Sequence, residues 1–161
     1  MIIPIYLTLI FVGYMVLTDR IAGTTYSISA SFYAWKAKNY SSAFIIFLAL
    51  ISFGLFLVVD YVEWKTTLAP ILLIIGAITN YAIGVYANYK QEKAYSTWHN
   101  ILSALTFLLV HLAFFIEGVR FPMLSFILLA AVFFFIDIDK KTTVIETVGI
   151  GLAILGVYYL I

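Results

Sequence analysis

Long apolar stretches separated by short clusters of charged and turn-forming residues dominate the chain. An α-helix needs about 20 apolar residues to cross the hydrocarbon core of a bilayer, with about 17 as a lower limit. The pattern therefore predicts an all-α bundle of six transmembrane helices, of which the first and fifth are short. They are Ile2–Leu17, Ser42–Val59, Leu68–Tyr86, Ile101–Ile116, Pro122–Ile136 and Val144–Ile161.

Residues 18–41 do not fit this pattern, because hydroxyl-bearing and small residues replace the apolar ones. We expect a serine-rich loop or a re-entrant segment here. A seventh spanning helix over 21–35 is the less favoured alternative. The serines that such a segment would bring to the bundle are Ser27, Ser29 and Ser31.

Composition supports lipid as the solvent. The 161 residues are 65% hydrophobic and 11% charged, and the mean hydropathy is +1.10, whereas soluble domains contain about 25% charged residues. The length allows one transmembrane domain, 1–161, without a separate soluble module. A net charge of +1 without a basic run gives no reason to expect a nucleic-acid partner. The absence of cysteine excludes disulfides and thiolate chemistry.

The distribution of Lys and Arg predicts the orientation. In the six-helix arrangement one side carries seven of them and the other side only Lys65 and Arg120. The positive-inside rule places the richer side in the cytoplasm. Loops 87–99 and 137–141 should therefore be cytoplasmic and the carboxyl terminus outside. A seventh helix would change the number of Lys and Arg residues on each side of the membrane, but it would not change the orientation of the later spans.

The fourth predicted helix carries a polar stripe. At 100° per residue its polar side chains fall within an arc of about 140°, and leucines occupy the opposite side. Unsatisfied polar groups are costly in hydrocarbon, so we expect the stripe to face the bundle interior. The stripe consists of His99, Asn100, Ser103, Thr106, His111 and Glu117. For each histidine, a structural hydrogen bond to a neighbouring helix is the alternative to a functional role.

Two further polar positions admit two interpretations. Asn80 lies in a ridge of small residues with Gly76 and Gly84, which favours close helix packing, although it can also meet the polar stripe. Glu146 forms a capping-box pattern with Thr143, which predicts a helix start there rather than a buried acid.

Metal and cofactor chemistry is not indicated. His99 and His111 lie on one helix, roughly 18 Å apart along its axis, so they cannot share a metal ion or ligate one haem. No metalloprotease, serine-hydrolase or phosphate-loop motif is present. We therefore expect no metal site and no cofactor.

Two segments resemble a known family. They are Ser27-Ile28-Ser29-Ala30-Ser31-Phe32-Tyr33 and the pattern His99-x-x-x-Ser103-Ala104-x-x-Phe107. Their placement resembles the DRAM-like six-helix membrane proteins, which are relatives of GPI-anchor-remodelling proteins, and small bacterial polytopic membrane proteins. The chain departs from the pattern in lacking a proline before the serines and in its short external loops. The resemblance implies a protein that acts on or near lipid, and it supplies no catalytic residue.

These observations lead to three hypotheses about function. The first is a membrane protein that binds a lipid or other amphiphile, or modulates a membrane partner, through the interior polar stripe. The second is an intramembrane lipid-modifying enzyme that uses His99 or His111 as a general base, with a serine such as Ser103 or Ser29 as its partner. The third is a small transporter or channel, which would need polar residues on several helices at matching depths; a homo-oligomer could instead supply a pore along its symmetry axis.

Overall fold

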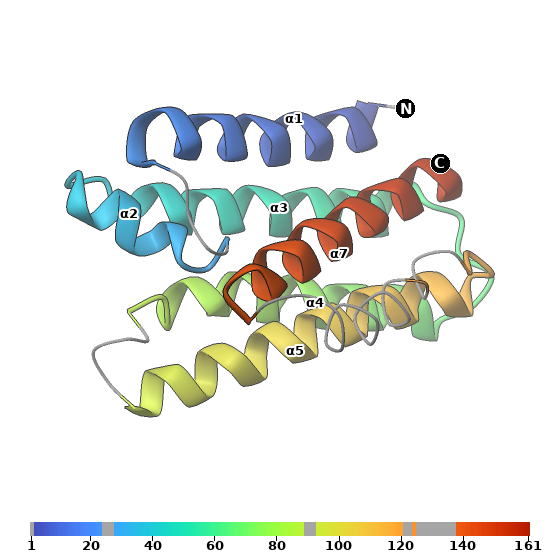
Figure 1. Cartoon of the computed structure of the whole chain (residues 1–161). Helices are drawn as coiled ribbons and strands as arrows, with labels where there is room; N and C mark the ends of the chain where they lie inside the picture. The colour runs from blue at the N-terminus through green and yellow to red at the C-terminus, as the bar shows by residue number, and fades with distance from the viewer. Residues whose placement is uncertain (1, 24–27, 89–92, 121–123, 125–137) are drawn as a thin grey trace.

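The fold is built from helices throughout the residues that the computed structural model describes, which are 2–23, 28–88, 93–120, 124 and 138–161. This confirms the predicted all-α bundle (Figure 1). The elements are α1 (Ile2–Leu17), the π-helical turn η1 (Thr18–Ala22), α2 (Ser31–Ala37), α3 (Ser42–Tyr61), α4 (Leu68–Val85), α5 (Lys93–Ile116) and α7 (Ile138–Leu160).

Four helical stretches in the described residues are long and apolar enough to cross a membrane. Only 22–39% of each apolar stretch is buried inside the bundle, so most of its apolar surface faces outward. In water such a surface would be unstable, because soluble proteins rarely expose large contiguous apolar patches. The chain is therefore a multi-pass membrane protein. The four stretches are Ile2–Ala22, Ser42–Tyr61, Leu68–Val85 and Ser96–Ile116.

Several helix ends differ from those predicted. The first helix does not stop before Asp19 but continues through η1, and Gly23, with a φ of 89°, ends it. Helices α5 and α7 begin at Lys93 and Ile138, so residues 93–99 and 138–141, predicted as loops, are helical. Lysine is a good helix former, and a helix can extend past the hydrocarbon into the interface. The predicted span Pro122–Ile136 lies almost wholly outside the described residues.

The serine-rich segment contains a short helix instead of a seventh span. Helix α2 has seven residues, a length of about 10 Å, which is too short to cross a bilayer. The turn at residues 28–30 interrupts any continuous helix over 21–35, so the alternative of a seventh span is wrong. The segment is fixed to α1 and α3: Trp35 Nε1 donates to Thr18 Oγ1 at 3.0 Å, and the rings of Phe32 and Phe44 are in edge contact.

The predicted ridge of small residues explains how α4 packs. Helix α4 lies between α3 and α5, and α7 contacts α1 and α5 (Figure 1). A Cβ atom at Gly76 would lie 2.9 Å from Val110 of α5, and one at Gly84 would lie 3.5 Å from Ile45 of α3. Between these glycines, the Asn80 amide donates to the Leu48 carbonyl of α3 at 3.1 Å. The ridge therefore joins α4 to both of its neighbours.

Candidate functional site

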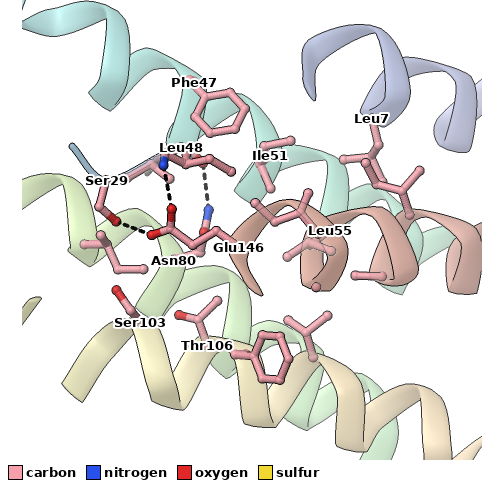
Figure 2. A pocket seen from close by; sticks show the side chains of 18 of the residues that line it. Leu7, Ser29, Phe47, Leu48, Ile51, Leu55, Asn80, Ser103, Thr106 and Glu146 are labelled. Atoms are coloured by element: carbon pink, nitrogen blue, oxygen red, sulfur yellow. Dashed lines mark hydrogen bonds between the residues drawn. The ribbon is translucent and has the colours of Figure 1, made fainter. Parts of the chain in front are cut away.

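A cavity of about 150 Å³ lies between α1, α3, α4, α5 and α7, with residues 28 and 29 of the serine-rich segment at one end. Six different parts of the chain thus contribute to one interior space. Most of its wall is aliphatic or aromatic. Among the described lining residues, the polar side chains are those of Ser29, Asn80, Ser103, Thr106, His111 and Glu146; all of them except His111 are labelled in Figure 2.

The polar groups gather toward one end of the cavity. Helices α5 and α7 run in the same direction (Figure 1). Among the lining residues, the polar Ser103 and Thr106 are the first that α5 contributes, and Glu146 is the first that α7 contributes. From Glu146 to Val157 the lining of α7 extends about 16 Å along the helix axis. The other end is formed by Leu7, Leu55, Ile154 and Val157. The space therefore has one polar end and one apolar end.

Small residues on α7 create this space. Gly149 and Ala153 line the cavity, and Gly156 packs against Phe114 of α5. A Cβ atom at Gly149 would lie only 2.3 Å from the ring of Phe107. Because Gly149 has no side chain, α7 can pack closely against the Phe107 ring of α5 at this point.

The structure confirms the predicted stripe for three of its residues, since Ser103, Thr106 and His111 line the cavity. Thr106 Oγ1 donates to Thr79 Oγ1 of α4 at 2.7 Å. The prediction is wrong for Asn100, whose side chain is exposed. Asn100 lies in the early turns of α5, toward the end of the bundle, where a polar side chain needs no interior partner.

His111 combines structural bonds with a place on the cavity wall. It is 2% exposed, and its Nδ1 lies 2.7 Å from the carbonyl oxygen of Phe107, so Nδ1 carries the proton. Its ring stacks on that of Phe107 with centroids 4.1 Å apart. The imidazole is thus held rigidly against α5 at the middle of the cavity.

Two predicted residues of the stripe lie away from the cavity. His99 is 3% exposed and hydrogen-bonds to the backbone at Ile83 and Tyr86, where α4 ends. Glu117, also 3% exposed, accepts hydrogen bonds from the backbone N–H of Lys65 and of Thr66 at 2.9 and 3.1 Å. Both side chains connect α5 to the end of another segment, which is a structural role.

Asn80 is held in a fixed orientation on the cavity wall. Its Nδ2 donates to the Leu48 carbonyl at 3.1 Å and to Ser52 Oγ at 2.9 Å. Because a carbonyl oxygen can only accept, the amide nitrogen must face α3. Oδ1 is consequently the acceptor that this side chain retains for another group.

Glu146 is the functional candidate that the sequence did not reveal. Helix α7 begins at Ile138, so Glu146 lies well inside it and the predicted capping box with Thr143 is wrong. Its Oε2 accepts the backbone N–H of Ile28 at 2.5 Å, and its Oε1 accepts the Ser29 hydroxyl at 2.8 Å (Figure 2). The carboxylate therefore fixes the serine-rich segment across the polar end of the cavity.

The three serines of that segment have different places. Ser29 lines the cavity and bonds to Glu146. Ser31 is 1% exposed and hydrogen-bonds to the Tyr14 hydroxyl and the Ile28 carbonyl, so it fixes the turn instead. Ser27 lies outside the described residues. No group of three or more His, Cys, Asp or Glu side chains in the described part of the chain is arranged to hold a metal ion.

Comparisons with known proteins provide no relative for this site. No protein-family model, no curated protein and no solved structure matches the chain. Its function therefore has to be inferred from the cavity and the residues around it.

Proposed function

We propose that this multi-pass membrane protein binds a single-chain amphiphile, or one chain of a lipid, in the cavity between its helices. The apolar chain would lie against Leu55, Ile154 and Val157, and the polar group would lie among Ser29, Ser103 and Glu146. The observation that supports this proposal is the distribution of polar groups: apart from His111 at the middle of the cavity, they line one end of an otherwise apolar space.

The energetics of such binding differ from those in water. An apolar chain leaves lipid hydrocarbon to enter the cavity, so burial itself provides almost no driving force. Filling an empty space still gains dispersion contacts for the atoms that line it. Selectivity must then come from the polar end, where a head group exchanges hydrogen bonds with fixed partners such as Asn80 and Glu146.

The other two hypotheses from the sequence have less support in this geometry. A histidine-activated serine would need the two side chains in hydrogen-bond contact. Ser103 and His111 lie about 12 Å apart along α5, and His99 contacts the end of α4 instead of the cavity. A conducting path would need polar groups along the whole cavity, whereas its described lining is apolar at one end.

Filling the cavity tests the proposal. Ala153→Phe places a large side chain inside it, and Leu155→Phe adds the same ring at a position that is 53% exposed on the same helix. We expect mass spectrometry of the purified protein to show at least a tenfold loss of copurifying amphiphile for Ala153→Phe and no loss for Leu155→Phe. Ser103→Leu, which removes a polar lining group, should also reduce the amount of copurifying amphiphile.

Melting in detergent micelles checks that each variant is folded. If the protein carries no amphiphile, or if both cavity variants fold and retain as much as Leu155→Phe does, the proposal is wrong.

A further inference from the structure

The polar end of the cavity contains an acid whose hydrogen-bond partners among the described residues are all neutral. The carboxylate of Glu146 receives the backbone N–H of Ile28 and the hydroxyl and backbone of Ser29. Each of these groups is a donor, and an ionised carboxylate is an acceptor only, with about four lone-pair positions. The described donors thus match the acceptor oxygens of a carboxylate, which have a lone-pair position left for one further donor.

No basic residue compensates that charge within the described lining of the cavity, because none of the lining residues there is Lys or Arg. His111 is the other ionisable group of the lining, and its Nδ1–H is committed to the Phe107 carbonyl. Lys36, at the end of the bundle, donates to Asn88. A half-buried charge beside an apolar space is costly without a counter-charge, so a cation supplied by the ligand would lower that cost.

Two more acceptors accompany Glu146. Asn80 uses its amide nitrogen on α3, which leaves Oδ1 as an acceptor, and Ser103 contributes a hydroxyl oxygen from α5. Figure 2 shows Asn80, Ser103 and Glu146 around the same end of the cavity. A primary ammonium group has three N–H donors and no acceptor. Its donors match the three acceptor side chains in number and kind.

We propose that the ligand of this cavity is a long-chain amphiphile with a primary ammonium head group, held by Glu146, Asn80 and Ser103. This inference rests on the proposed function and specifies its ligand class. An amphiphile whose head carries a carboxylate or phosphate and no ammonium group would place a second negative charge beside Glu146 in a low-dielectric space, where like charges repel strongly. The cavity therefore selects against anionic lipids.

The experiment compares three probes that share one chain length: tritiated hexadecylamine, hexadecanol and hexadecanoic acid. Binding is measured at neutral pH by scintillation proximity on protein captured in nonionic detergent. We expect the wild-type protein to bind hexadecylamine at least tenfold more tightly than hexadecanol and to bind hexadecanoic acid least. Glu146→Gln should bind the amine and the alcohol equally. Ser29→Ala removes one donor to the carboxylate but keeps its charge, and it should retain the preference for the amine.

The outcomes separate the two proposals. If the wild-type protein binds none of the three probes, the proposed function fails. If it binds hexadecanol as tightly as hexadecylamine, or if Glu146→Gln keeps the preference for the amine, amphiphile binding stands and the ammonium assignment is overturned. The wild-type comparison decides the question even if Glu146→Gln does not fold. Displacement of hexadecylamine by lysophosphatidylethanolamine would assign the ammonium to a phospholipid head group, and failure to displace it would assign a free amine.

Discussion

Two carboxylates, Glu146 and Glu117, each bind donors from a segment that is distant along the chain. Glu146 binds the turn at residues 28 and 29, and Glu117 binds the loop before α4. Hydrogen bonds to charged groups contribute more than neutral ones, roughly 1.5–3 kcal/mol each. Helices in lipid gain little stability from hydrophobic burial, because the lipid is itself apolar. Hydrogen bonds of this kind therefore determine the positions of the loops. Glu146 also faces the cavity, whereas Glu117 does not.

Glu117→Ala should destabilise the bundle without affecting the cavity. The substitution removes the acceptor of three hydrogen bonds, from Lys65 N–H, Thr66 N–H and Thr66 Oγ1. Because the loop donors can recover some bonds to water, we expect the free energy of unfolding to fall by about 2–3 kcal/mol. SDS-induced unfolding in mixed micelles measures this change.

Glu63→Ala is the matched control, because Glu63 is an exposed carboxylate near the same loop. It should change the free energy of unfolding by no more than about 0.5 kcal/mol. Equal effects of the two substitutions would show that the burial of Glu117 is not what stabilises the loop. Copurifying amphiphile should be unchanged in both variants.

For single residues, the sequence predicts correctly which side chains face the interior where helical periodicity alone decides it. Ser103, Thr106 and His111 could be placed inside because they share one face of a helix. Glu146 could not be assigned, since its partner Ile28 is 118 residues away and a capping pattern explained the residue locally. The prediction for Asn100 was wrong because helical periodicity shows which side of the helix a residue is on. It does not show how far along the helix the bundle interior extends.

At the scale of elements, glycines set how closely the helices pack. In α7, Gly149 lies against Phe107 and Gly156 against Phe114, both on α5. Gly151 lies between them on a face with no atom within 4 Å of an added Cβ. The same helix thus offers a tight and an open glycine two residues apart, so the effect of close packing can be separated from that of helix propensity.

Gly149→Ala should destabilise the protein, and Gly151→Ala should not. An alanine at position 149 must displace the Phe107 ring, which stacks on His111 and cannot move independently. Overpacking of this kind costs about 1–3 kcal/mol. At position 151 the added methyl meets no neighbour, and alanine is the better helix former by up to about 1 kcal/mol. Melting of both variants in micelles should order them as Gly151→Ala, wild type and Gly149→Ala; the reverse order would contradict the role assigned to Gly149.

Helix positions could be predicted from the sequence more readily than helix ends. The hydropathy of a span reports where a helix crosses hydrocarbon, but it is silent where the helix continues into the polar interface. For this reason α5 and α7 begin earlier than predicted, at Lys93 and Ile138, and η1 extends the first helix. The serine-rich segment was less predictable, because its short helix α2 depends on contacts with Thr18 and Phe44.

At the scale of the whole molecule, the direction of the chain connects the cavity with the expected membrane orientation. Helices α3, α5 and α7 begin at the same end of the bundle, and the serine-rich segment lies at that end (Figure 1). The excess of Lys and Arg predicts that this end is cytoplasmic. The polar end of the cavity would then face the cytoplasmic leaflet, and an amphiphile would enter with its head group on that side.

The absence of native cysteine makes this orientation directly measurable. Ser42→Cys and Thr67→Cys change exposed residues without altering any charge. Ser42 begins α3, which is about 30 Å long, and Thr67 lies beyond its other end, directly before α4. In intact bacterial spheroplasts a membrane-impermeant maleimide should label Thr67→Cys only, and after permeabilisation it should label both. Labelling of both variants from outside would show that α3 does not cross the membrane. Labelling of Ser42→Cys alone would keep the crossing but invert the orientation, and the polar end of the cavity would then receive its ligand from the outer leaflet.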